Sequence, residues 1–279
     1  MDIIAFLQNY LGLAGSILLL YFVVLPFEVL SPAEEGQPWI GRLQNIVYML
    51  GFIFVTALLI TPLFNSIYSV YFRYIGGGIL PLMVNADSGI VAHMAFGLFY
   101  AFVWDVWQYS VHRLQHAVPV LWETHIFHHS ERSLNSTSQA RTHLTQYVLY
   151  LVLFFPMFLI FAGQSPHLII AFIMFRILGI YNHSNIKISF GRLTPVISGP
   201  QWHRIHHSIQ IEHQDKNFAA IFPLIDIVGR TYYRPKKDEF PKTGLSDTGH
   251  FRFSNEATFL PLVNWYNMSQ KVIRSGRKI

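Results

Sequence analysis

Four long stretches of the chain carry no charged side chain, namely residues 3–27, 43–72, 88–104 and 144–175. A bilayer core about 30 Å thick is crossed by about 20 helical residues, and the backbone polar groups within it must be paired inside the helix. These runs predict an all-α fold, an integral-membrane helical bundle of about four to five spans or re-entrant segments. The composition agrees, because only 13% of the residues are charged, against about 25% in an average soluble protein.

The last uncharged run is too long for one membrane crossing. Its 32 residues would extend about 48 Å at about 1.5 Å per residue, and the glycine, serine and proline of residues 162–166 interrupt it. We therefore expect a helical hairpin over residues 144–181, which returns the chain to the side it came from. The polar stretches before and after the hairpin, residues 105–143 and 182–235, can then meet on one membrane face as a helical cap.

Basic side chains concentrate in the C-terminal part of the chain. Residues 1–100 carry two basic and five acidic side chains, whereas residues 101–279 carry eighteen and ten. Because Lys and Arg are retained on the cytoplasmic side, we expect a multi-pass protein whose polar cap and C-terminus face the cytoplasm. Nucleic acid is not an expected partner, since the basic residues are interleaved with histidines and apolar segments rather than gathered in a basic arm.

Histidine is strongly clustered in the polar stretches. Nine of the fourteen histidines lie in the 29 positions of residues 112–129 and 203–213, where an even distribution would place about 1.5. The chain has no cysteine, which excludes disulfides, thiolate zinc sites and cysteine-ligated iron–sulfur clusters. A metal in this protein must therefore be held by nitrogen or oxygen atoms.

The spacing of the histidines is typical of metal ligands on helices. Residues 125–129 and 203–207 both have the form His-x-x-His-His, and residues 112–116 have the form His-x-x-x-His. Positions i, i+3 and i+4 of a helix fall within an arc of about 100°. Eight imidazoles exceed the three protein ligands that a catalytic zinc ion takes and suit two metal ions. Imidazole binds iron, zinc, copper and nickel, so the ligand type does not name the metal.

Further polar residues are candidates for supporting roles around this cluster. His183 follows the hairpin directly and is a candidate ligand. A histidine ligand normally donates its second ring N–H to a carboxylate or a carbonyl. The residues that could accept this hydrogen bond or orient a ligand ring are Asp105, His143, His213, Asp215 and Asp226. Asp226 lies among apolar residues and needs a partner, because an unpaired buried charge is costly. His93, His167 and His250 are expected to be structural.

The three histidine motifs, with a hairpin between the second and the third, resemble those of the fatty acid hydroxylase/sterol desaturase superfamily of integral-membrane di-iron enzymes. The resemblance covers about residues 100–233 and includes Trp104-Asp105, Tyr109, Trp122, Ser130, Arg141 with His143, and Asp215-Lys216-Asn217-Phe218. The chain has Asn217-Phe218-Ala219 where members often have Asn-Tyr-Gly, and Leu144 where they have proline after the histidine. These departures bear on the subfamily and the substrate more than on the metal chemistry.

The resemblance implies an oxidoreductase with two iron ions on the cytoplasmic side and dioxygen as co-substrate. It would hydroxylate or desaturate an unactivated C–H bond of a lipid, such as a fatty acyl chain or a sterol-like molecule. The ligands carried over are His112, His116, His125, His128, His129, His203, His206 and His207, with His183 at an additional position. Zinc can replace iron at such imidazole sites.

Electrons would have to come from a separate donor, since no dinucleotide-binding motif follows an evident strand and no cysteine can hold a cluster. We expect a cytochrome b5-like protein or a ferredoxin with its reductase. It would dock on a basic face formed by Arg204, Arg230, Arg234, Lys236 and Lys237.

The predicted organisation is a single membrane-embedded unit over residues 1–279. Residues 1–104 would form anchor helices, with the first apolar stretch retained because it lacks the basic start of a signal peptide; residues 105–235 would form the catalytic region and residues 236–279 a surface tail. The alternative is a non-enzymatic membrane metal transporter or sensor. It predicts ionisable residues within the spans, whereas the histidine motifs lie outside the uncharged runs.

Overall fold

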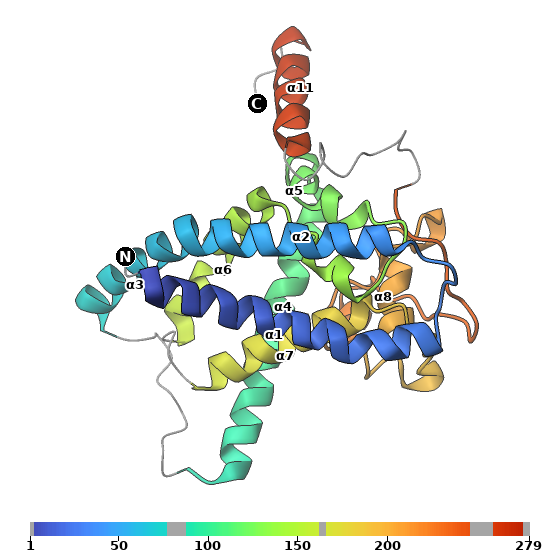
Figure 1. Ribbon diagram of the computed structural model, residues 1–279, viewed down its shortest axis with the longest axis horizontal. Helices are drawn as coiled ribbons and strands as arrows, with labels where there is room; N and C mark the ends of the chain where they lie inside the picture. The colour runs from blue at the N-terminus through green and yellow to red at the C-terminus, as the bar shows by residue number, and fades with distance from the viewer. Residues whose placement is uncertain (1–2, 77–87, 162–165, 246–258, 276–279) are drawn as a thin grey trace.

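A computed structural model describes residues 3–76, 88–161, 166–245 and 259–275 (Figure 1). Within these residues every regular element is a helix, and β-pairing is limited to isolated bridges between Pro32 and Ile186 and between Ser208 and Thr243. The all-α prediction is therefore confirmed. The segment 77–87, the expected hairpin break at 162–165 and His250 lie outside the described residues.

Six long helices form the body of the protein. They are α1 (Ile3–Leu30), α2 (Trp39–Val55), α3 (Thr61–Ile75), α4 (Ile90–Ala117), α6 (Leu144–Phe161) and α7 (Pro166–His183), with the π-helical turn η1 (Thr56–Ile60) joining α2 to α3. Short elements carry most of the polar residues: α5 (Pro119–His129), η2 (Ser136–Ala140), η3 (Gly191–Leu193), α8 (Pro200–His206), η4 (Ile211–His213) and α9 (Leu224–Val228). The last described helix is α11 (Leu260–Ser275).

Within the described ranges, three helices are long and apolar enough to cross a membrane: α1, the continuous stretch from Trp39 to Ile75, and α4. Their outer surfaces are apolar, and Leu11, Phe22 and Val91, for example, are 64%, 72% and 76% exposed. Such extensive exposed apolar surface marks contact with lipid rather than with water. The protein is therefore a membrane protein.

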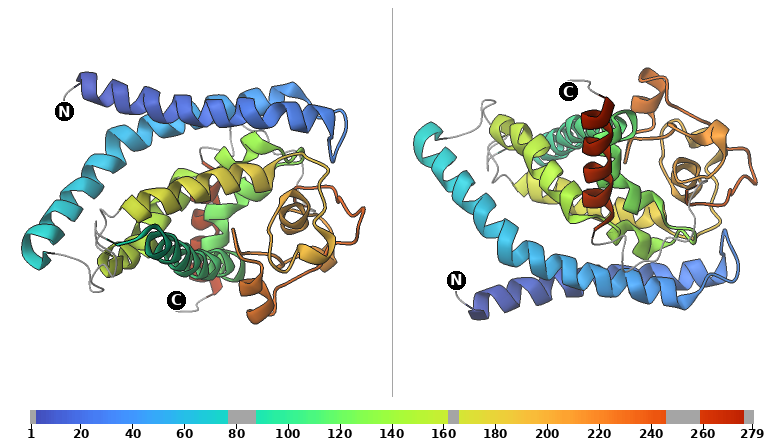
Figure 2. Two further views of the ribbon diagram at one scale, coloured as in Figure 1. Left: turned by 90° about the horizontal axis from the view of Figure 1, so that it is seen from below. Right: turned by 90° about the horizontal axis from the view of Figure 1, so that it is seen from above.

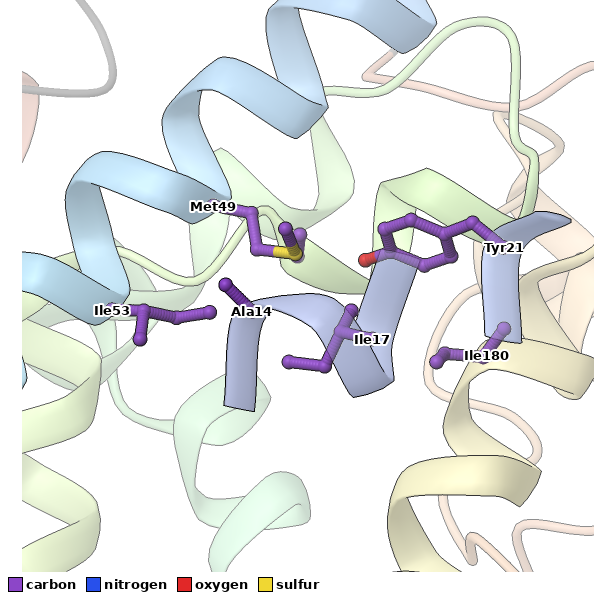
Figure 3. Packing of buried hydrophobic residues seen from close by; sticks show 7 residues of the cluster. Ala14, Ile17, Tyr21, Met49, Ile53 and Ile180 are labelled. Atoms are coloured by element: carbon purple, nitrogen blue, oxygen red, sulfur yellow. The ribbon is translucent and has the colours of Figure 1, made fainter. Parts of the chain in front are cut away.

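Helices α1 and α2 lie side by side, and α3 then diverges from α1 (Figure 2). The pair is held by a small apolar core in which Ala14, Ile17 and Tyr21 of α1 meet Met49 and Ile53 of α2 (Figure 3). Ile180 of α7 joins the same cluster. Helices in lipid associate through close packing of their side chains, and this core thereby fixes α7 against the anchor pair.

A buried carboxylate ties the end of α1 to the polar cap. Glu28 is 2% exposed, pairs with the Arg42 guanidinium, and accepts the backbone N–H groups of Ser136 and Asn185 at 2.7 Å each. The two backbone donors lie in the polar stretches before α6 and after α7. One side chain thus joins both stretches to the anchor.

The two halves of the double-length run are the 18-residue helices α6 and α7. The end of α7 returns to the region where α6 begins, since η2, just before α6, packs on α7 and Nε2 of His183 lies 3.0 Å from Nε2 of His128. The two polar stretches meet at one end of the α1–α2 pair, around α8 (Figure 1).

The surface tail contains a helix that the sequence did not predict. Helix α11 projects from the body beside α5 (Figure 1), with the Trp265 indole N–H donating to the Val120 carbonyl at 2.9 Å and Asn264 bonded to Glu123. Residues 246–258 and 276–279 of the tail lie outside the described part.

Candidate metal centre

The structure brings all nine predicted histidine ligands together. They come from the C-terminal half of α4, from α5, from the last residue of α7, and from α8 with the residue that follows it. Their nitrogen atoms form two groups, in each of which the candidate ligand atoms lie within 4.8 Å of one another. The first group is His112, His116, His125, His129 and His206, and the second is His128, His183, His203 and His207.

Each His-x-x-His-His motif is divided between the two groups. On α5 the i, i+4 pair of His125 and His129 joins the first group, while His128 joins the second. On α8 the assignment is reversed, because the pair of His203 and His207 joins the second group and His206 joins the first. The rings of His129 and His207 stack at 4.4 Å between centroids where the two groups touch.

Three imidazoles of the first group have their orientation set by an acceptor on Nδ1. His112 meets the Phe218 carbonyl at 3.0 Å, His206 the Lys216 carbonyl at 2.8 Å, and His116 the Asp215 carboxylate at 3.2 Å. These oxygens can only accept, so Nδ1 carries the proton and the Nε2 lone pair faces the group.

The second group is oriented in the same way at one position. Nδ1 of His183 donates to the Gly179 carbonyl one turn earlier at 2.6 Å. Among the described residues, the Nδ1 atoms of His128, His203 and His207 are buried without a hydrogen-bond partner. This group is therefore held by packing of its rings, with less support from hydrogen bonds than the first.

The ligand atoms fit the bonding geometry of a metal ion. Neighbouring Nε2 atoms are separated by 3.0 Å between His112 and His125, 3.1 Å between His116 and His129, and 3.2 Å between His203 and His207. Two nitrogens on one metal, each at about 2.1 Å, lie about 3.0 Å apart when the angle between their bonds is near 90°. Converging lone pairs repel one another unless a cation lies between them, so each group fits a metal ion.

Burial keeps the imidazoles in the form that binds metal. Desolvation lowers the pKa of His128, His203, His206 and His207 well below the ordinary value, and the neighbouring histidines lower it further. The same causes lower the pKa of His125 and His129. These rings are neutral at pH 7, and a neutral imidazole is the form that ligates metals.

A turn after α8 aims two backbone carbonyls at the histidines. Asp215 and Asn217 adopt left-handed conformations with φ of 57° and 59°, which Asp and Asn tolerate better than most residues. The Asn217 side chain donates to the Trp202 and Tyr233 carbonyls at 3.1 Å and accepts the Tyr233 N–H at 2.8 Å. The turn is thereby locked, with the carbonyls of residues 216 and 218 directed at His206 and His112.

Two buried carboxylates hold the segment that follows this turn. Asp226 accepts the backbone N–H groups of Phe218 and Ala219 and the hydroxyl of Thr231 at 2.7–2.9 Å. Asp105 accepts the N–H groups of residues 220–222 at 2.7–2.9 Å. Neither carboxylate contacts a histidine of the two groups. They fix the backbone that contacts His112, whereas Asp215, whose side chain is 71% exposed, bonds His116 directly.

Two predicted supporting histidines lie outside both groups. His143 accepts the backbone N–H and contacts the hydroxyl of Thr145 at the start of α6. His213 is buried beside Ser208, Glu239 and the Tyr233 ring. His93 lies near the start of α4, also outside the groups.

Sequence reasoning gave no role to two side chains that brace the site. The Phe218 ring packs against His112, His116 and His206 with centroids 4.9–5.3 Å apart. Arg141 lies over the Phe127 ring and donates to the Phe127 carbonyl and to Ser130, which fixes the end of α5. Both residues belong to the motifs that resemble the family. Their contacts could not be predicted from the sequence because they depend on the fold.

A cavity of about 500 Å³ opens beside the histidines. Five ligand histidines from both groups line one part of it, and apolar side chains of η1, α3, α4 and α7 line another, among them Ile60, Phe64, Trp104 and Phe175. Of the aromatic residues that precede His112, Trp104 lines the cavity, whereas Tyr100 packs against Phe161. Arg176 also lines the cavity.

The fold and the cluster define a class of protein: a helical membrane protein with two adjacent histidine groups that can hold metal. Comparison with known families specifies it further. Residues 97–231 match the family model for fatty acid hydroxylase, a range that contains all nine histidines. This region of the chain is therefore similar to fatty acid hydroxylases.

Curated relatives are similar over the same region. The chain is 28% identical to alkylglycerol monooxygenase of Danio rerio over 136 residues, which are 48% of this chain and 30% of that protein. It is 26% identical to the human alkylglycerol monooxygenase over 46% of the chain and 28% of that protein. It is 27% identical to ornithine lipid hydroxylase OlsE of Rhizobium tropici over 50% of the chain and 42% of that protein. The chain thus covers less than half the length of these relatives. No solved structure shows significant similarity to it.

Proposed function

We propose that the protein is a membrane-bound di-iron oxygenase that hydroxylates, or desaturates, an unactivated C–H bond of a lipid. The observation that carries this proposal is the cavity, which joins apolar walls of the membrane helices to ligand histidines of both metal groups. A lipid in that cavity lies beside the metals without crossing water. The names of the relatives, which are lipid oxygenases and hydroxylases, support the same class of reaction.

Iron is the metal proposed for both groups, held by five histidines in the first and four in the second. When bound, the two iron ions supply the redox chemistry that activates dioxygen. All-imidazole sites also accept zinc, so zinc in a purified sample would indicate replacement of iron during expression.

The chain itself positions the ligands and the substrate. Backbone carbonyls and Asp215 keep Nδ1 protonated at His112, His116 and His206, which leaves Nε2 free to ligate. The membrane-side walls of the cavity exclude bulk water and favour a hydrocarbon chain.

Hydroxylation places one oxygen atom of dioxygen in the C–H bond and releases the other as water. Two electrons and two protons are consumed, and we propose that a separate one-electron carrier supplies the electrons. Arg230, Arg234, Lys236 and Lys237 are exposed as expected for a docking face. Arg204 is not available, which corrects the sequence prediction: it is 2% exposed and paired with Glu34, because it joins α8 to the loop after α1.

The alternative function is metal transport, which predicts a row of histidines along a path across the membrane. The nine histidines instead form two compact groups in the cap, which favours resident metal ions.

Metal content tests the proposal. Protein purified from iron-rich medium should hold about two iron ions per chain, and His206→Ala and His128→Ala should each lower the content to about one, since they belong to different groups. His93→Ala is the matched control, because it removes an imidazole 19 residues before His112, about 28 Å away along α4.

Turnover provides the second measurement. Incubation with a membrane lipid extract, a reducing system and isotopically labelled dioxygen should yield lipids with one labelled oxygen atom for hydroxylation, or unlabelled lipids with two hydrogen atoms fewer for desaturation. Neither ligand variant should form these products. A metal content of one ion per chain, or a metal content that neither ligand substitution changes, would overturn the di-iron proposal.

A further inference from the structure

Arg176 is a basic residue in an unusual place. It lies in the eleventh position of the 18-residue helix α7, directly after the uncharged run of residues 144–175, and its side chain lines the cavity. A charged side chain within a membrane helix is costly and is generally retained for function, with a partner that compensates the charge.

No carboxylate supplies that compensation in the part of the chain that the structure describes. The buried Glu28 is paired with Arg42, and the half-buried Glu34 is paired with Arg204. The titratable neighbours of Arg176 are two tyrosines, Tyr21 and Tyr147, and the Tyr21 hydroxyl has no hydrogen-bond partner among the described residues. Among the described residues Arg176 therefore lines the cavity without a carboxylate partner, while Tyr21 belongs to the apolar core of α1 and α2.

The position of Arg176 relates it to the metal groups. It precedes His183 by seven residues, which places both on about the same face of α7 and about 10 Å apart along the helix axis. The stretch between them includes Gly179, which also lines the cavity and leaves room for the Gln139 side chain. A molecule that fills the cavity can thus contact Arg176 and the histidines at the same time.

We propose that Arg176 is the head-group site of the cavity and binds the oxyanion of an acidic single-chain lipid. This inference deepens the proposed oxygenase function and rests on it. A guanidinium presents paired N–H donors that match a carboxylate or a phosphate in a bidentate fashion. The oxyanion supplies the missing negative charge to a guanidinium that lines the cavity.

The cavity supports a single chain rather than a larger lipid. Its volume of about 500 Å³ is in the range of pockets that enclose one small ligand, and its apolar wall is built from aromatic side chains such as Phe52, Phe64 and Phe175. A fixed head group sets which carbon of the chain lies beside the metals. Arg176 is therefore a residue that determines the position of oxidation.

Equilibrium binding of three ligands with one chain length tests this inference: dodecanoate, dodecyl phosphate and dodecanol, titrated calorimetrically into the purified full-length protein. The wild type should bind one or both oxyanions at least about tenfold more tightly than the alcohol, as a charge-assisted hydrogen bond requires. A preference for dodecanoate identifies a carboxylate head group, and a preference for dodecyl phosphate identifies a phosphate.

Substitutions assign the effect to the residue. Arg176→Gln should abolish the preference for oxyanions while leaving dodecanol binding unchanged, and Arg176→Lys should keep part of it, because the charge remains and the bidentate geometry is lost. Arg192→Gln is the control, since it removes an exposed arginine that does not line the cavity. Equal binding of all three ligands by the wild type, or an oxyanion preference that survives in Arg176→Gln, would overturn the proposal.

The same titration after treatment with a chelator separates this inference from the proposed function. Head-group recognition does not need iron, so the preference should persist in the metal-free protein. A protein that lacks two metal ions but prefers oxyanions through Arg176 would contradict the oxygenase and retain the site. A protein that holds two iron ions but does not prefer oxyanions would retain the oxygenase proposal and contradict the head-group site.

Discussion

Asp226 and Asp215 support the histidine groups by different means, and the difference can be measured. Asp226 is fully buried and accepts three hydrogen bonds, two of them from the backbone of Phe218 and Ala219. Both carboxylate oxygens of Asp226 accept hydrogen bonds. In Asp226→Asn one of them is replaced by an NH2 group, which faces a donor in either orientation of the amide. The Phe218 carbonyl should then shift away from His112, and metal affinity should fall about 10–100-fold, the usual cost of losing an outer partner of a ligand.

Asp215→Asn is the comparison for this prediction. The Asp215 side chain is 71% exposed, and its amide oxygen can still accept from His116 or be replaced by water, so the loss of affinity should be less than about tenfold. Competition with a chromogenic chelator measures both variants. A metal affinity lower in Asp215→Asn than in Asp226→Asn would show that the direct contact with His116 matters more than the support of the backbone by Asp226.

The residues of the site could be predicted because histidine spacing is a local property. A separation of i, i+3 and i+4 places three rings on one helix face whatever surrounds the helix, and all nine histidines indeed converge. Their partition into two groups could not be predicted, since it depends on how α5 and α8 are rotated relative to each other. Arg176 was overlooked for the same reason, because only the fold shows that it lines the cavity.

The elements that carry the ligands are short. Helices α5 and α8 have 11 and 7 residues, and isolated helices shorter than about 12–15 residues are marginal in water. Both begin with a proline at their first turn, and Gly199 precedes α8 where a Cβ atom would lie 2.6 Å from the Phe190 ring. Their stability must come from packing and from whatever binds between them.

Metal removal should therefore loosen these two helices selectively. The ligands come from four helices, α4, α5, α7 and α8, of which α5 and α8 are the shortest, and a bound metal stabilises the folded state by mass action. We expect chelation to raise amide hydrogen exchange in α5 and α8 at least about tenfold, as a loss of about 1.4 kcal/mol or more would produce. Mass spectrometry of peptic fragments measures it.

Helices α1 and α2 provide the internal control for that experiment. Their contact rests on Ala14, Ile17, Met49 and Ile53, which lie outside the histidine groups, so their exchange should stay unchanged. A uniform rise over all helices would mean that the metals stabilise the whole fold rather than the cap. No change in α5 and α8 would mean that the histidines are held without metal.

The helices extend beyond the uncharged runs where a charged side chain is satisfied inside the protein. Helix α1 continues past Phe27 to Leu30 because Glu28 is buried on Arg42 and backbone donors. Helix α4 likewise passes through Asp105, whose carboxylate is bonded to residues 220–222. The amphipathic helix α11 carries no such run and was missed.

At the scale of the whole molecule, charge and shape give one orientation. The cap around α8 lies at one end of the α1–α2 pair, and the end of α3 lies at the other (Figure 1). Exposed basic residues lie at the end of the cap and directly after it, among them Arg234, Lys236 and Lys237. Because Lys and Arg are retained in the cytoplasm, the cap should face the cytoplasm and α3 should end near the opposite face.

The absence of cysteine from the sequence makes this orientation directly testable, since any introduced cysteine is the only thiol. Lys237→Cys, at an exposed side chain directly after the cap, should react with a membrane-impermeant maleimide only after the cells are permeabilised. Tyr74→Cys, at a side chain 79% exposed near the end of α3, should react in intact cells. Leu19→Cys, on the apolar surface of α1 and 62% exposed, should react in neither, because lipid excludes the reagent from it. Labelling of Lys237→Cys in intact cells would place the histidine groups on the outer face, out of reach of a cytoplasmic electron donor.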